Sequence, residues 1–157
     1  MKKEFRFQYE HFTSILEMNT EQIVAVQAAE LASMDAYAPY SNFKVGAALL
    51  LTDGTMIIGN NQENKAFPSG LCAERVALFN FGSQNLEAEI KYLAIVGGGE
   101  MLKPDEIFSP CGSCRQVMAE YADKQATPFQ IILKNPDGSC YVFESISHLL
   151  PFVFGNK

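Results

Sequence analysis

Three cysteines and one glutamate have the types and spacing that could support chemistry in this chain. Cys72 and Glu74 lie two residues apart in the largely apolar run at residues 71–78, and Cys111 and Cys114 are three residues apart. Side chains at i and i+3 share a helix face, so the sulfurs of Cys111 and Cys114 can face the same point. Helix N-termini favour thiolates, and converging thiolates suit Zn²⁺.

Three cysteine ligands, with a carboxylate nearby, indicate a catalytic zinc site. Catalytic sites commonly have three protein ligands and keep the fourth position for water, and Glu74 would supply a nearby carboxylate. Three thiolates leave the metal site with a net negative charge. Arg75 and Arg115 each directly follow a motif residue, and either could hydrogen-bond a ligand sulfur and withdraw charge.

The same residues have simpler explanations when taken one at a time. A lone C-x-x-C at Cys111 and Cys114 would equally fit a redox dithiol. Cys72 alone would usually be a small buried residue, and Glu74 alone a carboxylate at a helix N-terminus. A zinc-stabilised module without catalytic activity, with Cys140 as the fourth ligand, is the alternative from another functional class. Whether the fourth ligand is water or sulfur separates that module from an enzyme.

The hydrophobic pattern predicts helices that alternate with buried strands. The chain has 157 residues, of which 48% are hydrophobic and 19% charged, as expected for one folded domain. Helices are predicted at residues 19–36, 71–82 and from about 110, and strands at 44–52, 55–60, 92–98, 129–135 and 139–144. This order predicts an α/β fold: a three-layer α-β-α sandwich with a mixed sheet of about five strands.

The first helix and the residues before it have clear local patterns. Asn19 and Gln22 form a predicted capping box that opens this helix. Its predicted buried side consists of Ile23, Val26, Ala29 and Leu31. Apolar and polar residues alternate at positions 4–10, which predicts a half-buried strand. We treat residues 1–18 as an N-terminal extension and residues 19–157 as the catalytic domain.

Charge and hydropathy exclude several kinds of partner. The formal net charge is −6, which argues against binding nucleic acid through its phosphates. No apolar run approaches the roughly 20 residues needed to span a bilayer, so no membrane partner is expected. The N-terminal segment "MKKEFRFQYE" is charged and lacks the apolar core of a signal peptide. We therefore expect a cytoplasmic protein, in which cysteines favour metal binding or catalysis over disulfides.

Taken together, these motifs are much more specific than each alone. The chain contains C-x-E, then P-C-x-x-C, and also "YAPYSNFKVGAALL", "NQEN" and "LLP". It resembles the cytidine deaminase family in its small, three-cysteine, homotetrameric form, over roughly residues 20–155. The resemblance implies zinc-dependent hydrolysis of cytidine and 2′-deoxycytidine to uridine and 2′-deoxyuridine, with release of ammonia, as in pyrimidine salvage. Deamination of another cytosine-bearing molecule, such as an antibiotic of the blasticidin S type, is the alternative within the family.

The resemblance also implies roles for individual residues. The zinc ligands fall on Cys72, Cys111 and Cys114, the proton shuttle on Glu74, and the charge-compensating arginine on Arg75. The substrate-binding residues fall on Asn61 and Glu63 for the ribose, on Phe43 beside the pyrimidine, and on Phe154, which would reach a neighbouring subunit's site. The loop after Asn64 reads "KAFPSGL" where the family has an A-S-Y-like run, and Phe152 is the alternative to Phe154 for the contact with the neighbouring subunit.

Overall fold

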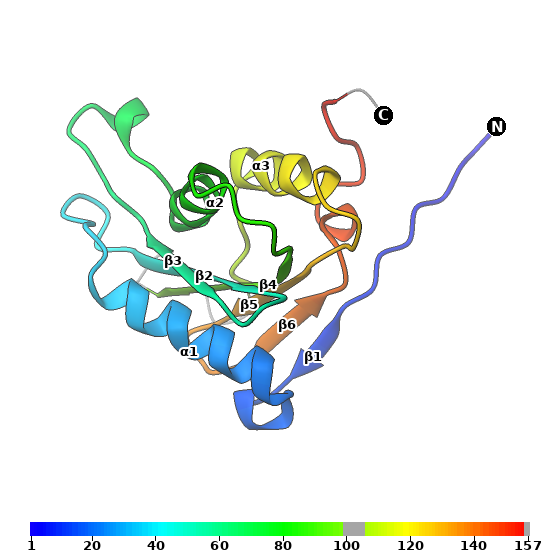
Figure 1. Ribbon diagram of the computed structural model, residues 1–157, viewed down its shortest axis with the longest axis horizontal. Coiled ribbons are helices and arrows are strands. Elements are labelled where there is room, and N and C mark those ends of the chain that lie inside the picture. Colours follow the sequence, from blue (N-terminus) through cyan, green and yellow to red (C-terminus); the bar gives the residue numbers. More distant parts are fainter. Residues whose placement is uncertain (99–105, 156–157) are drawn as a thin grey trace.

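Six strands form one mixed sheet with helices on both faces (Figure 1). The computed structural model describes residues 1–98 and 106–155. In sheet order, the strands are β1 (Glu10–Phe12), β6 (Cys140–Phe143), β5 (Gln130–Lys134), β4 (Ile90–Gly98), β2 (Lys44–Leu51) and β3 (Met56–Asn60). The helices are α1 (Thr20–Met34), α2 (Ala73–Ser83) and α3 (Gly112–Asp123), with 3₁₀ turns at Ile15–Glu17, Phe67–Ser69 and Ile146–His148. The predicted α-β-α sandwich is confirmed, with six strands instead of about five.

The central strands have apolar side chains on both faces because each face is covered by helices. In β2, Ala47 and Leu49 pack into the core that contains residues of α2 and α3, whereas Ala48 and Leu50 pack against α1. Strand β4 pairs antiparallel with β2 and parallel with β5, and so lies inside the sheet. The apolar runs predicted as buried strands therefore form the middle of the sandwich.

Two glycines allow the helices to approach the sheet closely. A Cβ atom at Gly46 in β2 would lie 1.9 Å from the carbonyl oxygen of Ala29 in α1. A Cβ atom at Gly59 in β3 would lie 2.5 Å from the backbone nitrogen of Ala77 in α2. The absence of side chains at these glycines therefore sets the positions of both helices, including the N-terminal end of α2.

Helix α1 begins as predicted but buries a different stripe. The capping box of Asn19 and Gln22 is present. Leu31 was predicted to be buried, but 65% of it is exposed. The prediction was wrong because the buried stripe follows the i, i+3, i+4 rows through Gln22, Ala25, Val26, Ala29 and Ala32.

Among the described residues, no helix combines the length and apolarity needed to cross a bilayer.

The strand predicted at residues 4–10 is wrong in its position. Strand β1 covers Glu10–Phe12 and is the edge strand beside β6. Its pairing ends at Glu10, opposite Val142, and β6 itself ends one residue later, at Phe143. Before β1, the backbone N–H of Gln8 donates to Nδ1 of His148 at 3.1 Å. About half of each apolar side chain in this stretch is exposed, namely Phe5, Phe7 and Tyr9.

Candidate active site

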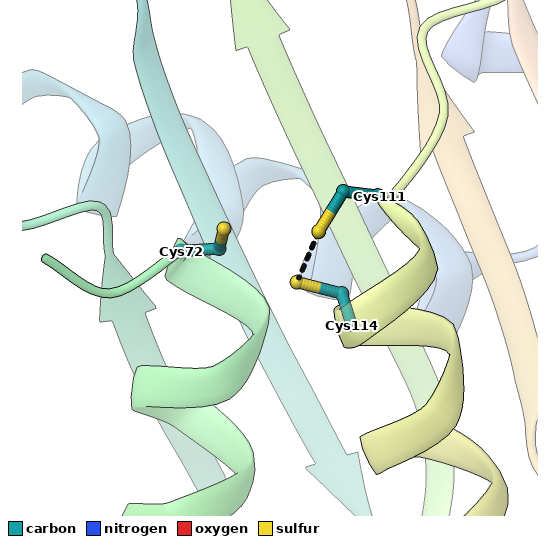
Figure 2. Close-up of side chains that lie close together, drawn as sticks. All are labelled: Cys72, Cys111 and Cys114. Carbon is teal, nitrogen blue, oxygen red and sulfur yellow. Dashed lines mark hydrogen bonds between the residues drawn. The ribbon is translucent and has the colours of Figure 1, made fainter. Parts of the chain in front are cut away.

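The N-termini of α2 and α3 bring three cysteines together. Cys72 is the N-cap residue of α2, Cys111 is the N-cap residue of α3, and Cys114 lies in the first turn of α3. The sulfurs of Cys111 and Cys114 face each other, and Cys72 lies across from them at the start of α2 (Figure 2). All three Sγ atoms lie within 4.8 Å of one another, and those of Cys111 and Cys114 are 3.5 Å apart.

This arrangement fits a zinc ion. A tetrahedral site with Zn–S bonds of about 2.3 Å separates its sulfurs by about 3.8 Å, which is close to the observed spacing. Two helix N-termini at one point also stabilise the thiolates that zinc requires. Cys140 is fully buried in β6 and packs in the core beneath α1, whereas Cys114 belongs to the core beneath α2 and α3. The alternative with Cys140 as a fourth ligand is therefore wrong.

Cys72 and Cys114 differ in how readily they lose a proton. The pKa of Cys72 is lowered to about 5, mainly by its hydrogen bond with Cys114 and also by Arg75. Nη2 of Arg75 donates to Sγ of Cys72 at 3.4 Å. The pKa of Cys114 moves in the opposite direction, because it shares a hydrogen bond with Cys72 and is buried. Cys72 therefore becomes a thiolate before Cys114, and metal binding would release the Cys114 proton.

Of the two arginines that could bond a ligand sulfur, Arg75 does so and Arg115 makes other contacts. Its guanidinium donates to the carbonyl oxygens of Pro110 and Leu149, at 2.8 and 2.9 Å, and to Oγ of Ser109 at 3.0 Å. These bonds use Nε and both terminal nitrogens, and none of them goes to a ligand sulfur. The guanidinium instead holds the segment before Cys111 against the C-terminal part of the chain.

Glu74 is buried in the first turn of α2, with 3% of the residue exposed. Its pKa is raised to about 7, mainly because burial disfavours the ionised carboxylate, with a smaller contribution from the Cys72 thiolate. A carboxyl group with this pKa can both accept and release a proton near neutral pH.

One cavity of about 490 Å³ contains most of the predicted site residues. They are Phe43, Asn61, Glu63, Cys72, Glu74 and Cys111. A second cavity of about 490 Å³ also includes Asn61, Glu63 and Cys72, and adds Arg75, Tyr40 and Phe67. Two of the three converging thiols, the buried carboxyl group and three of the substrate-binding candidates thus line one cavity.

Comparison with known proteins decides the family. The family model for the cytidine and deoxycytidylate deaminase zinc-binding region matches residues 18–128. The chain belongs to this family. The cytidine deaminase of Halalkalibacterium halodurans is 40% identical over 130 residues, which is 83% of this chain and 88% of that protein. The cytidine deaminase of Sporosarcina psychrophila is 37% identical over 140 residues, 89% of this chain and 94% of that one.

A solved structure of the family has the same fold. The crystal structure of cytidine deaminase from Burkholderia pseudomallei superposes with a TM-score of 0.74 at 38% sequence identity. The match covers 87% of this chain and all of that one, at 100%. Zinc is accordingly the cofactor of this deaminase-family chain, and the three converging thiols are positioned to bind a metal ion.

Phe43 and Phe108 form an aromatic wall on one side of the deaminase cavity. Their ring centroids are 5.8 Å apart. Phe108 rests on Gly97, where a Cβ atom would lie 2.5 Å from the ring. Phe108 was not among the predicted site residues, although its position three residues before Cys111 places a bulky ring near the metal ligands.

The predicted ribose-binding residues are already partly engaged within the chain. Nδ2 of Asn61 donates to the carbonyl oxygen of Phe43 at 2.9 Å, and its Oδ1 accepts from the N–H of Val45 at 2.8 Å. Each end of this amide keeps one further hydrogen-bonding position. The carboxylate of Glu63 accepts from the backbone N–H of Tyr40 at 2.9 Å. Phe154 is 90% exposed and lines neither of these cavities of its own chain.

Proposed function

We propose that this chain catalyses the zinc-dependent hydrolytic deamination of cytidine and 2′-deoxycytidine to uridine and 2′-deoxyuridine, with release of ammonia, in pyrimidine salvage. The observation that carries the proposal is the buried carboxyl group of Glu74 beside three converging thiols, in a cavity that also includes Phe43 and Glu63. The names of the 40% and 37% identical relatives support the same reaction.

The reaction needs an activated water and a group that moves protons. A zinc ion held by Cys72, Cys111 and Cys114 would supply Lewis-acid activation of water. The carboxylate of Glu74 would take one proton from the water whose oxygen bonds to C4 and deliver it to N3 of the pyrimidine. Glu74 would then carry the second water proton to the amino group. The C4–N bond breaks, ammonia leaves, and C4 keeps the oxygen as a carbonyl.

The remaining candidates would bind and orient the nucleoside. Phe43, supported by Phe108, would lie beside the flat pyrimidine. Glu63 would accept a hydrogen bond from a ribose hydroxyl, and Asn61 would use its free hydrogen-bonding positions on the sugar. Arg75 would offset the negative charge of the metal site through its bond to Cys72.

Nucleosides should be much better substrates than the free base or the 5′-monophosphate. The pKa of Glu63 is lowered, mainly by its hydrogen bond from Ser41, so this partly exposed group stays ionised and would repel a phosphate near the sugar. Cytosine lacks the sugar that Asn61 and Glu63 would bind. We expect kcat/KM for CMP and for cytosine to be about 100-fold below that for cytidine. Ammonia release from cytidine, deoxycytidine, cytosine and CMP measures this, and equal turnover of CMP and cytidine would contradict it.

We further propose a homotetramer in which Phe154 completes the site of a neighbouring subunit. Gln116 of α3 supports this by holding the backbone of Phe154 from both sides. Its Nε2 donates to the Phe154 carbonyl oxygen at 2.7 Å, and its Oε1 accepts from the Phe154 N–H at 3.2 Å. The backbone is therefore held in place while the ring stays exposed.

Replacing Phe154 should weaken substrate binding in this assembly. We expect Phe154→Ala to raise KM for cytidine about 10-fold, because an aromatic contact is lost. Phe152→Ala is the matched control, since Phe152 is similarly exposed, at 87%. Light scattering measures the oligomeric state. An active monomer, or an unchanged KM for Phe154→Ala, would argue against the shared site.

The proposed enzyme also has an expected domain organisation, location and substrate class. Residues 1–18 would be an extension that adds β1 to the sheet of the catalytic domain at 19–157. A cytoplasmic location would suit the four free cysteines. The net charge of −6 favours a small nucleoside over a nucleic acid as the substrate.

A further inference from the structure

The hydroxyl of Ser41 lies between two substrate-binding candidates. It accepts a hydrogen bond from the backbone N–H of Phe43 at 3.0 Å. It also hydrogen-bonds Oε1 of Glu63. Because an ionised carboxylate can only accept, the hydroxyl must donate its proton to Glu63 and accept with a lone pair from Phe43. One hydroxyl thus joins the carboxylate and the aromatic wall.

We propose that Ser41 is a positioning residue that aims the Glu63 carboxylate and fixes Phe43 for nucleoside binding. The inference rests on the proposed function, because it assigns Ser41 to the same substrate site. Ser41 lines both cavities beside the thiols, as does Glu63. It is therefore placed where a change in either partner would alter the shape of the substrate site.

The backbone around Ser41 is built to hold this geometry. Oε2 of Glu63 accepts from the backbone N–H groups of Tyr40 and Ser41, at 2.9 and 3.3 Å. Asn42 has a φ of 54°, in the left-handed region, and its N–H donates to the carbonyl oxygen of Ala38 at 3.1 Å. Asparagine tolerates this conformation better than most residues. The turn consequently closes around the Glu63 carboxylate.

The backbone of Phe43 is held from both sides. Its N–H is bound by Ser41, and its carbonyl oxygen accepts from Asn61 at 2.9 Å. Without the Ser41 hydroxyl, the hydrogen bond from Asn61 would still hold the Phe43 backbone, but the one to Ser41 would be lost. Glu63 would also lose one of its hydrogen-bond donors. Among the described residues that line the two cavities, the other charged side chains are Glu74 and Arg75. Ser41 makes no hydrogen bond to Glu74 or to Arg75 in the bonds described here. Removal of the Ser41 hydroxyl should therefore weaken substrate binding and leave the proton-transfer step intact.

The test compares Ser41→Ala with Ser41→Thr, which keeps the hydroxyl. We expect Ser41→Ala to raise KM for cytidine about 10-fold, with kcat changed by less than about 3-fold, and Ser41→Thr to restore most of the loss. Ser147→Ala is the matched control, because Ser147 pairs with Ser145 and lines neither cavity. A melting temperature for each variant shows that it folds. An unchanged KM in Ser41→Ala, or a loss that Ser41→Thr does not restore, overturns the inference.

A second measurement is independent of turnover. Hydrogen bonds from Ser41 and from the Tyr40 backbone lower the pKa of Glu63 in the intact chain. The Glu63 carboxyl should therefore titrate at a higher pH in Ser41→Ala, which NMR of its side-chain carbon can follow. An unchanged titration overturns the inference. Failure of the proposed function looks different, because the unaltered chain would then release no ammonia from cytidine.

Discussion

Glu74→Gln is expected to abolish most turnover while the zinc and the fold are kept. Glutamine has nearly the same shape as glutamate, so it can occupy the buried position at the start of α2. Its amide cannot take a proton from water or carry one to the pyrimidine. General acid–base catalysis contributes about 10²–10⁴-fold, so we expect kcat to fall by at least that factor.

The pH dependence provides a second check on Glu74. The pKa of its carboxyl group is raised to about 7, mainly by burial. The ionised form is the base that starts the reaction, so turnover by the unaltered chain should fall as the pH drops through this region. Glu74→Gln should lose this titration along with its activity. The exposed Glu120 of α3 offers a matched control, since Glu120→Gln changes a surface carboxylate paired with Lys124.

Zinc content, melting temperature and ammonia release should be measured together on these two variants. If Glu74→Gln binds zinc and turns cytidine over at a near-normal rate, Glu74 has no part in the mechanism. A loss of zinc in Glu74→Gln would instead mean that the carboxyl group supports the metal site.

Removing any one of the three converging cysteines should cost both the zinc and the activity. Each of Cys72→Ala, Cys111→Ala and Cys114→Ala removes one of three sulfurs that lie within 4.8 Å of one another. Metal activation of water contributes several kcal/mol, so its loss should lower turnover by about 10³-fold or more. Chelation of the unaltered chain should have the same effect, and added zinc should reverse it.

Cys140→Ala is the matched control for these variants. Cys140 is as fully buried as Cys114 but lies in the other core, beneath α1. We expect it to keep one zinc per chain and near-normal turnover, with at most a small loss in melting temperature. Metal analysis decides the matter. Full zinc and full activity in any of the three ligand variants would refute that ligand assignment.

The sequence by itself determined the helices, most strands and the chemical character of the site. Helix caps and hydrophobic periodicity act over a few residues, so the start of α1 at Asn19 and the buried run of β2 could be read locally. The spacing of Cys111 and Cys114 likewise depends on one helical turn. Together with C-x-E, this spacing led to the deaminase family, which the comparisons confirm.

Only the tertiary structure decided which distant groups meet. Arg75 and Arg115 were both candidates for a bond to a ligand sulfur: Arg75 makes it, whereas Arg115 binds Leu149, which is 34 residues away, because the C-terminal segment lies against α3. The strand predicted before residue 10 lacks pairing because β6 ends opposite it. Cys140 faces the α1 side of the sheet, away from the three converging thiols. Neighbouring residues of a strand face opposite layers, so the register of β6 decides which side Cys140 faces. The Ser41–Glu63 contact spans 22 residues and depends on how two loops close over the sheet. Local patterns specify elements, whereas the partners of a side chain depend on non-local packing.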